Sequence, residues 1–156
     1  MLFRSDVPTD RAQEILDSYF AAFPRIEAFM QECIRSAREH GYTTTLLGRR
    51  RLLPELTSDN FRIRQMGERM AQNAPVQGTA ADIFKVAMIR TARALAESGL
   101  GGRMVLTVHD ELVLEVPTGE RAATEELVRV AMEGAAELQV PLVVDLGTGA
   151  TWADAK

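Results

Sequence analysis

The chain is poor in cysteine and histidine. Its 156 residues include one cysteine, Cys33, and two histidines, His40 and His109. One cysteine cannot form an internal disulfide, and a lone thiol fits the reducing cytoplasm, where we expect the protein to act. A zinc site is not expected from so few thiols and imidazoles, and a catalytic Cys33 would lack an apparent His or Asn partner.

Long apolar runs are also missing from the sequence. None is long enough to span a membrane, so we expect no membrane partner. The first ten residues, MLFRSDVPTD, have neither the apolar core nor the cleavage site of a secretion signal. Apolar residues make up 46% and charged residues 26% of the chain. This balance is typical of a globular domain with a real core and argues against disorder.

Negative charge predominates, but the two signs of charge are separated along the chain. The net charge of -4 by itself argues against a nucleic-acid partner. Acids outnumber bases from residue 110 onward, whereas residues 49–69 carry six arginines against three acids. This separation suits a protein that grips an anion in one place and holds metal cations in another. The six arginines are Arg49, Arg50, Arg51, Arg62, Arg64 and Arg69.

The periodicity of the first half predicts helices and one hairpin. Helices are expected over 10–23 and 25–40, the second opened by Pro24 and stopped by Gly41. Residues 42–54 read as a hairpin with arginines in its returning strand. A helix over about 60–72 is expected to break at Pro75, and a longer helix over 76–99 to end at the glycines that follow.

The second half predicts a ββαβ pattern. Strands are expected over 103–108 and 112–116, an amphipathic helix over 118–139 and a last strand over 141–149. The whole order favours an α+β fold, in which a small antiparallel sheet carries helices on one side and follows an N-terminal helical and hairpin region.

The stretch LTVHDELVLEV, residues 106–116, sets polar residues between two apolar strands. A tight turn at His109 and Asp110 would pair Val108 with Glu111, so that the strands are buried and the polar tip is exposed. One interpretation is an ordinary polar turn. The other is a Mg²⁺ site, because adjacent carboxylates repel unless a cation neutralises them and Mg²⁺ prefers hard oxygen ligands. His109 could then touch a phosphate or a sugar.

A second polar group lies in the segment ERMAQNAPVQGTAAD, residues 68–82. Arg69, Asn73 and Gln77 are four residues apart, which puts them along one side of a helix pair that breaks at Pro75. Their side chains could bind phosphates, sugars or base edges, and Gly78 would allow a close approach. The alternative is a helix corner with a solvated polar face.

The run GRRR, residues 48–51, also has two interpretations. Its arginines could clamp a nucleic-acid backbone, where each neutralised phosphate adds salt-dependent affinity. They could equally be a solvated hairpin strand or a protected sheet edge.

Taken together, these segments resemble one family. TLLGRRRLLPEL, ERMAQNAPVQGTAADIFKVAM and LTVHDELVLEVP follow one another in the order and at about the spacing of the C-terminal part of the bacterial DNA polymerase I family, the family A DNA polymerases. The tail VPLVVDLGTGATW resembles that family's final strand. The resemblance runs from roughly residue 8 to residue 153.

The resemblance implies a role for each motif. Asp110 and Glu111 look like the acidic pair of the palm, with Asp110 binding catalytic Mg²⁺, and His109 looks like a contact to the primer terminus. The implied reaction is attack of a primer 3′-hydroxyl on the α-phosphate of a deoxynucleoside triphosphate, with two Mg²⁺ ions stabilising the attacking and leaving oxygens. Primer–template DNA is the implied partner of Arg69, Asn73 and Gln77 near the insertion site and of Arg49, Arg50 and Arg51 along the duplex.

The chain departs from the family pattern in two respects. It has no stretch resembling the strand motif DYSQIE, which carries another palm Asp, and no fingers helix that receives the nucleotide. We therefore expect a fragment that is inactive alone, with residues 1–98 as partial fingers and helices leading into the palm and 99–156 as a palm portion. The exposed sheet edge and apolar surface would favour self-association. A non-catalytic nucleic-acid-binding module and a purely structural fragment are the rival interpretations.

Overall fold

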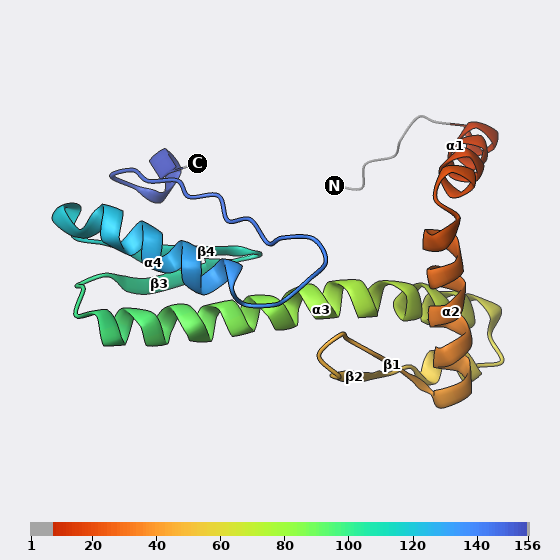
Figure 1. The fold of residues 1–156 in the computed structure, drawn as a ribbon. Coiled ribbons are helices and arrows are strands. Elements are labelled where there is room, and N and C mark those ends of the chain that lie inside the picture. Colours follow the sequence, from red (N-terminus) through yellow and green to blue (C-terminus); the bar gives the residue numbers. More distant parts are fainter. Residues whose placement is uncertain (1–7, 156) are drawn as a thin grey trace. The chain divides into compact units, whose positions relative to one another are not determined.

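The computed structural model describes residues 8–155 (Figure 1) and has the expected α+β composition. Contacts divide the chain into two compact units, Met1–Gly78 and Thr79–Lys156, which are described separately below. The expected fingers-to-palm boundary at residues 98 and 99 lies further along the chain. The elements are α1 (Thr9–Ala22), α2 (Pro24–His40), β1 (Tyr42–Thr44), β2 (Arg50–Leu52), η1 (Pro54–Thr57), α3 (Phe61–Ser98), β3 (Arg103–Val108), β4 (Glu111–Glu115), η2 (Thr118–Glu120), α4 (Arg121–Glu133) and η3 (Trp152–Ala155).

The first unit begins with helices whose limits follow from local chemistry. Pro24 occupies the first turn of α2, where its missing N–H costs no hydrogen bond. Gly41 ends α2 with a φ of 77°, and its N–H donates to the carbonyl of Ala37 at 2.9 Å. This left-handed ending is cheap for glycine, so the predicted stop at Gly41 is confirmed.

A small core joins α2, the β1–β2 hairpin, η1 and α3 in the first unit. Its buried residues are Ala37, Leu53, Leu56 and Ala71, and Leu53 is only 1% exposed. The hairpin turns at Gly48, whose φ is 84°, and pairs Thr43 with Arg51 in antiparallel register. The predicted hairpin with arginines in its second strand is therefore confirmed.

Helix α3 corrects the prediction of a break at Pro75. The helix begins after Asn60, whose side-chain oxygen accepts from the N–H of Arg62 at 2.9 Å, and it continues through Pro75 to Ser98. Proline removes one helical hydrogen bond, at a cost of about 3 kcal/mol in a helix interior. Ala74 and Gln77 near it are good helix formers, and Ala71 and Ala74 of the same stretch are buried. Packing and propensity therefore outweigh one missing bond.

The second unit is built on the β3–β4 hairpin. Its register pairs Val108 with Glu111, as predicted, and Leu106 with Val113. The preceding helix ends at Ser98 with Gly99 at a φ of 72°, two residues before the glycines expected to stop it. The buried residues of this unit come from both of its helices and from the turn after α4, and they include Ala87, Thr91, Leu95, Thr124, Val128 and Ala135.

Neither strand of the second hairpin is buried, contrary to the prediction. Val105 is 47% and Leu106 50% exposed. A register irregularity between Met104 and Leu106 interrupts the alternation of the two faces. The sheet of this unit has two strands in the described part of the chain, so much of its apolar surface lacks a covering layer. Uncovered apolar surface was itself an expectation from the sequence.

The final strand predicted over 141–149 does not form. This segment is irregular, and Val143 is 76% exposed. Its backbone groups instead bond side chains of α4. The N–H of Val144 donates to Glu133 at 3.1 Å, and the carbonyl of Val144 accepts from Arg129 at 3.4 Å. An apolar pattern predicts a strand only where a neighbouring strand takes up the backbone hydrogen bonds.

None of the helices between residues 8 and 155 is both long enough and apolar enough to cross a lipid bilayer.

Candidate functional site

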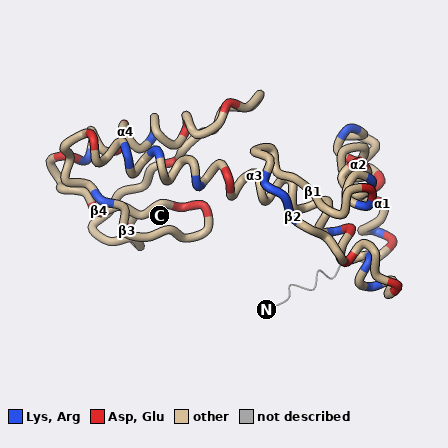
Figure 2. The backbone as a smooth tube through the Cα atoms, turned by 90° about the horizontal axis from the view of Figure 1, so that it is seen from below, with Lys and Arg blue, Asp and Glu red and all other residues tan. Residues whose placement is uncertain are grey.

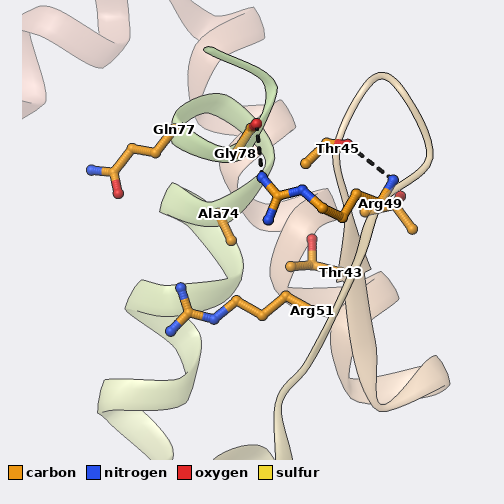
Figure 3. Close-up of a pocket in the computed structure, with 8 residues that line it drawn as sticks. Thr43, Thr45, Arg49, Arg51, Ala74, Gln77 and Gly78 are labelled. Carbon is orange, nitrogen blue, oxygen red and sulfur yellow. Dashed lines mark hydrogen bonds between the residues drawn. The ribbon is translucent and has the colours of Figure 1, made fainter. Parts of the chain in front are cut away.

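The first unit contains a pocket of about 160 Å³ between the β1–β2 hairpin and α3 (Figure 3). The hairpin contributes Thr43, Thr45, Arg49 and Arg51 among others, and α3 contributes Ala74, Gln77 and Gly78. The structure thus brings Gln77 beside two of the arginines that sequence analysis had placed in a separate motif. The lining is rich in hydrogen-bond donors, which favours an anionic ligand.

The three consecutive arginines have different surroundings. Arg49 donates from its guanidinium to the carbonyl of Gly78 at 3.1 Å, and its backbone N–H donates to the hydroxyl of Thr45 at 3.1 Å. Figure 3 shows both bonds as dashed lines. Arg50 stacks over the ring of Tyr42 at 4.7 Å. Arg51 lines the pocket, and its guanidinium has no hydrogen bond or ion pair within the described part of the chain.

Gly78 permits the close contact between α3 and the hairpin. A Cβ atom at this position would lie 2.7 Å from Cγ2 of Thr45 and 3.4 Å from a guanidinium nitrogen of Arg49. The first distance is shorter than carbon atoms tolerate. The close approach predicted at this glycine therefore occurs, and the partner that approaches is the protein's own hairpin.

Arg69, Asn73 and Gln77 all lie on the single helix α3 and are all exposed. Because the helix continues through Pro75, a spacing of four residues keeps the three side chains along one side of it. Gln77 lines the hairpin pocket, whereas Arg69 and Asn73 lie outside its lining. Arg69 has no bonded partner among residues 8–155, so its guanidinium is available to a ligand.

The turn of the second hairpin carries His109, Asp110 and Glu111, and all three are exposed. Figure 2 shows red at this turn and blue along strand β2, so the turn carries negative charge and β2 carries positive charge. The φ of His109 is 54°, the one positive φ of a non-glycine residue in the described chain. Two-residue hairpin turns favour positive φ, and histidine adopts it more readily than most side chains.

The two carboxylates of this turn can serve as part of a metal site. The carboxylates of Asp110 and Glu111 have no hydrogen bond or ion pair to any residue that the structure describes. Both therefore offer hard oxygen atoms, which suit Mg²⁺, an ion that uses one or two carboxylates and takes its other ligands from water and phosphate. Over residues 8–155 no group of three or more metal-binding side chains forms, so the protein supplies an incomplete shell.

The residues that support the arginines were not predicted from the sequence. Tyr42 holds Arg50, and Thr43 and Thr45 form one wall of the pocket. The β-branched run had indicated a strand, but which residue faces which arginine depends on the register, and the register is set by a turn whose type the sequence does not specify.

The chain is similar to known proteins over nearly its whole length. The family model for DNA polymerase family A matches residues 3–154. DNA polymerase I of Mycobacterium tuberculosis is 51% identical over 146 residues, and that of Geobacillus stearothermophilus is 47% identical over 151 residues. The matches cover 94% and 97% of this chain but only 16% and 17% of those relatives.

A solved structure is also similar. The POL domain of Pol1 from M. smegmatis, in complex with DNA primer-template and dNTP, matches with a TM-score of 0.92 and 46% sequence identity. The match covers 96% of this chain and 26% of that one. The likeness therefore extends over both units of this chain and over a minor part of the larger proteins.

Proposed function

The chain belongs to DNA polymerase family A, and from that membership we propose that it is the C-terminal part of a DNA-directed DNA polymerase. The parent enzyme would transfer nucleotides from deoxynucleoside triphosphates to a primer 3′-hydroxyl. The observation that carries this proposal is the family match over residues 3–154, which includes both the arginine hairpin and the acidic turn. The cytoplasm, where bacterial DNA is copied, is the proposed place of action.

Primer–template DNA is the proposed partner of the first unit. The guanidinium groups of Arg51, Arg62 and Arg69 have no hydrogen bond or ion pair within the described residues, and all three residues are exposed. Exposed guanidinium groups without acidic partners suit phosphate contacts. The similar POL domain was solved with DNA primer-template and dNTP, which supports the same class of partner here.

Mg²⁺ is the proposed cofactor, and Asp110 and Glu111 are the residues that would hold it. When bound, the ion would neutralise phosphate charge and stabilise oxygens that gain charge during transfer. The protein's own part is positional. The tight turn fixes the two carboxylates next to each other at an exposed tip, and His109 would contact the primer terminus. Arg69, Asn73 and Gln77 would align the template and primer.

We propose that the isolated chain binds nucleic acid without extending it. One pair of adjacent carboxylates supplies too few ligands for two metal ions, and the described residues offer no third acid beside them. The rival view of a purely structural fragment does not require unpaired arginines or unpaired carboxylates.

Binding of a fluorescent primer–template duplex across a series of KCl concentrations tests the DNA proposal. The logarithm of the affinity should fall linearly with the logarithm of salt, and the slope should shrink when Arg49, Arg50 and Arg51 are all changed to alanine. A matched control changes Arg11, Arg25 and Arg35 of the N-terminal helices, which removes the same charge. Equal losses in the two triple variants would mean that binding follows net charge alone.

Self-association is the second proposed property of the isolated chain. Exposed apolar residues on the second hairpin and the segment after α4 include Val105, Leu106, Val140 and Val143. Exposed strand edges of this kind pair with other chains. Sedimentation velocity should show a coefficient that rises with concentration, and a clean monomer at high concentration would refute the proposal.

A further inference from the structure

The arginines of the hairpin alternate between its two faces. Successive residues of a strand point to opposite faces, and directly paired residues of neighbouring strands share a face. Arg51 pairs with Thr43, which is only 8% exposed and lines the pocket toward α3. Arg50 pairs with Thr44 and stacks on Tyr42, on the other face. One nucleic-acid strand lying on one face of the hairpin therefore cannot meet both side chains equally.

Arg49 shares the face of Arg51 but is already engaged. Its guanidinium donates to the carbonyl of Gly78 and thereby ties the hairpin to α3 (Figure 3). That contact is made possible by the missing Cβ of Gly78. Breaking the bond to bind a phosphate would loosen the hairpin from the helix. Arg49 therefore acts as a positioning residue that holds the hairpin against α3.

We propose that Arg51 is the residue of this hairpin that binds a duplex phosphate, while Arg49 and Arg50 hold the hairpin in shape. This inference rests on the proposed function, because it assumes a nucleic-acid ligand. Among the three arginines, Arg51 is the one whose guanidinium has no hydrogen bond, ion pair or aromatic contact in the described chain, and it lines the pocket that Gln77 also lines. A phosphate bound there would meet a guanidinium fork and an amide donor.

Single substitutions separate Arg51 from its neighbours. Primer–template binding is measured over a KCl series for the unmodified chain and for Arg50→Ala, Arg51→Ala and Arg51→Lys. Arg51→Ala should lower the salt slope by about 0.9, the value for one phosphate contact. Arg51→Lys should restore the slope because it keeps the charge, and Arg50→Ala, which removes the same charge from the next position, should leave the slope unchanged.

Urea unfolding gives a readout that needs no DNA. Arg49→Ala should lower the unfolding midpoint of the first unit, and Arg51→Ala should leave it unchanged. Equal salt slopes for Arg50→Ala and Arg51→Ala, or equal loss of midpoint for Arg49→Ala and Arg51→Ala, would overturn the division of roles. Failure of the unmodified chain to bind primer–template at any salt concentration would overturn the proposed function as well.

Discussion

The two hairpins differ in whether the charged side chains near their turns contact the rest of the protein. In β1–β2 the charged side chains next to the turn are bonded to the protein, through Gly78 for Arg49 and Tyr42 for Arg50. In β3–β4 the carboxylates of Asp110 and Glu111 have no hydrogen bond or ion pair among residues 8–155. One hairpin is thus fastened to a helix, whereas the other projects unsatisfied acids into solvent.

This difference distinguishes charged side chains that hold the fold together from charged side chains that are open to a ligand. In the first hairpin, Arg49 and Arg50 contact the protein itself, whereas the guanidinium of Arg51 has no such contact. The second holds its acids together at the cost of repulsion between neighbours and of a positive φ at His109. Such costs persist where a ligand relieves them. A bound cation would neutralise the pair, which is why the acidic turn is the stronger candidate for a metal site.

The largest expected effect is on packing. Leu53→Ala, which empties a fully buried position beside the first hairpin, should lower the free energy of unfolding by about 2–5 kcal/mol. Leu106→Ala is the matched change in the second hairpin, where the side chain is 50% exposed, and should cost about 1 kcal/mol or less. Urea denaturation measures both, and equal costs would erase the contrast between the hairpins.

The Cys33 thiol gives a separate readout for the first unit. Burial raises the pKa of this thiol, and the adjacent charge of Glu32 raises it further. The reactive thiolate is therefore scarce at neutral pH while the unit is folded, so labelling by a thiol reagent should be slow. Leu53→Ala should accelerate labelling at pH 7, and Leu106→Ala should not.

The next effect concerns the contact that fastens the first hairpin. Gly78→Ala would normally stabilise a helix by about 0.5–1 kcal/mol. Here the new methyl group meets Cγ2 of Thr45, so we expect a net loss of about 1–3 kcal/mol. Adding Thr45→Ser removes that methyl group, keeps the hydroxyl that binds the Arg49 N–H, and should recover stability. Stabilisation by Gly78→Ala alone would show that the hairpin does not rest on α3.

A smaller effect is expected at the turn of the second hairpin. His109→Val should destabilise the second unit by about 1–2 kcal/mol, because a β-branched residue resists a φ of 54°. His109→Gly should not destabilise it, since glycine accepts this conformation. Hydrogen exchange of the β3 and β4 amides measures both changes. Equal protection in the two variants would remove the argument for backbone strain at this residue.

The smallest expected effect is the loss of weak metal binding when an acid of the second hairpin's turn is replaced. Two carboxylates without a phosphate ligand should bind a divalent cation with a dissociation constant on the order of millimolar. Paramagnetic Mn²⁺ should broaden the NMR signals of His109 in the unmodified chain and much less in Asp110→Asn, and a chelator should reverse the broadening. Glu115→Gln is the control, because Glu115 is already paired with Arg103 at 2.6 Å. Equal broadening in Asp110→Asn would place the ion elsewhere.

Sequence patterns predicted features that depend on local chemistry. Gly41 and Gly48 end or turn the chain where expected, and a two-residue turn at His109 fixes the register of β3 and β4. The errors lie where distant contacts decide the outcome. α3 continues through Pro75 because tertiary packing compensates one lost bond, and the segment 141–149 is not a strand because α4 side chains take its backbone groups. The division of roles among the arginines likewise depended on register and on Tyr42.

Primer extension by the purified chain tests the central claim most directly. The reaction contains Mg²⁺, primer–template and all four deoxynucleoside triphosphates, with Asp110→Ala in parallel. We predict no extension by either protein, because the proposed ligands Asp110 and Glu111 would supply only part of a two-metal site. Extension by the unmodified chain that disappears in Asp110→Ala would contradict the account. It would mean that another acid, such as Asp145 or a carboxylate from a second copy, completes the site.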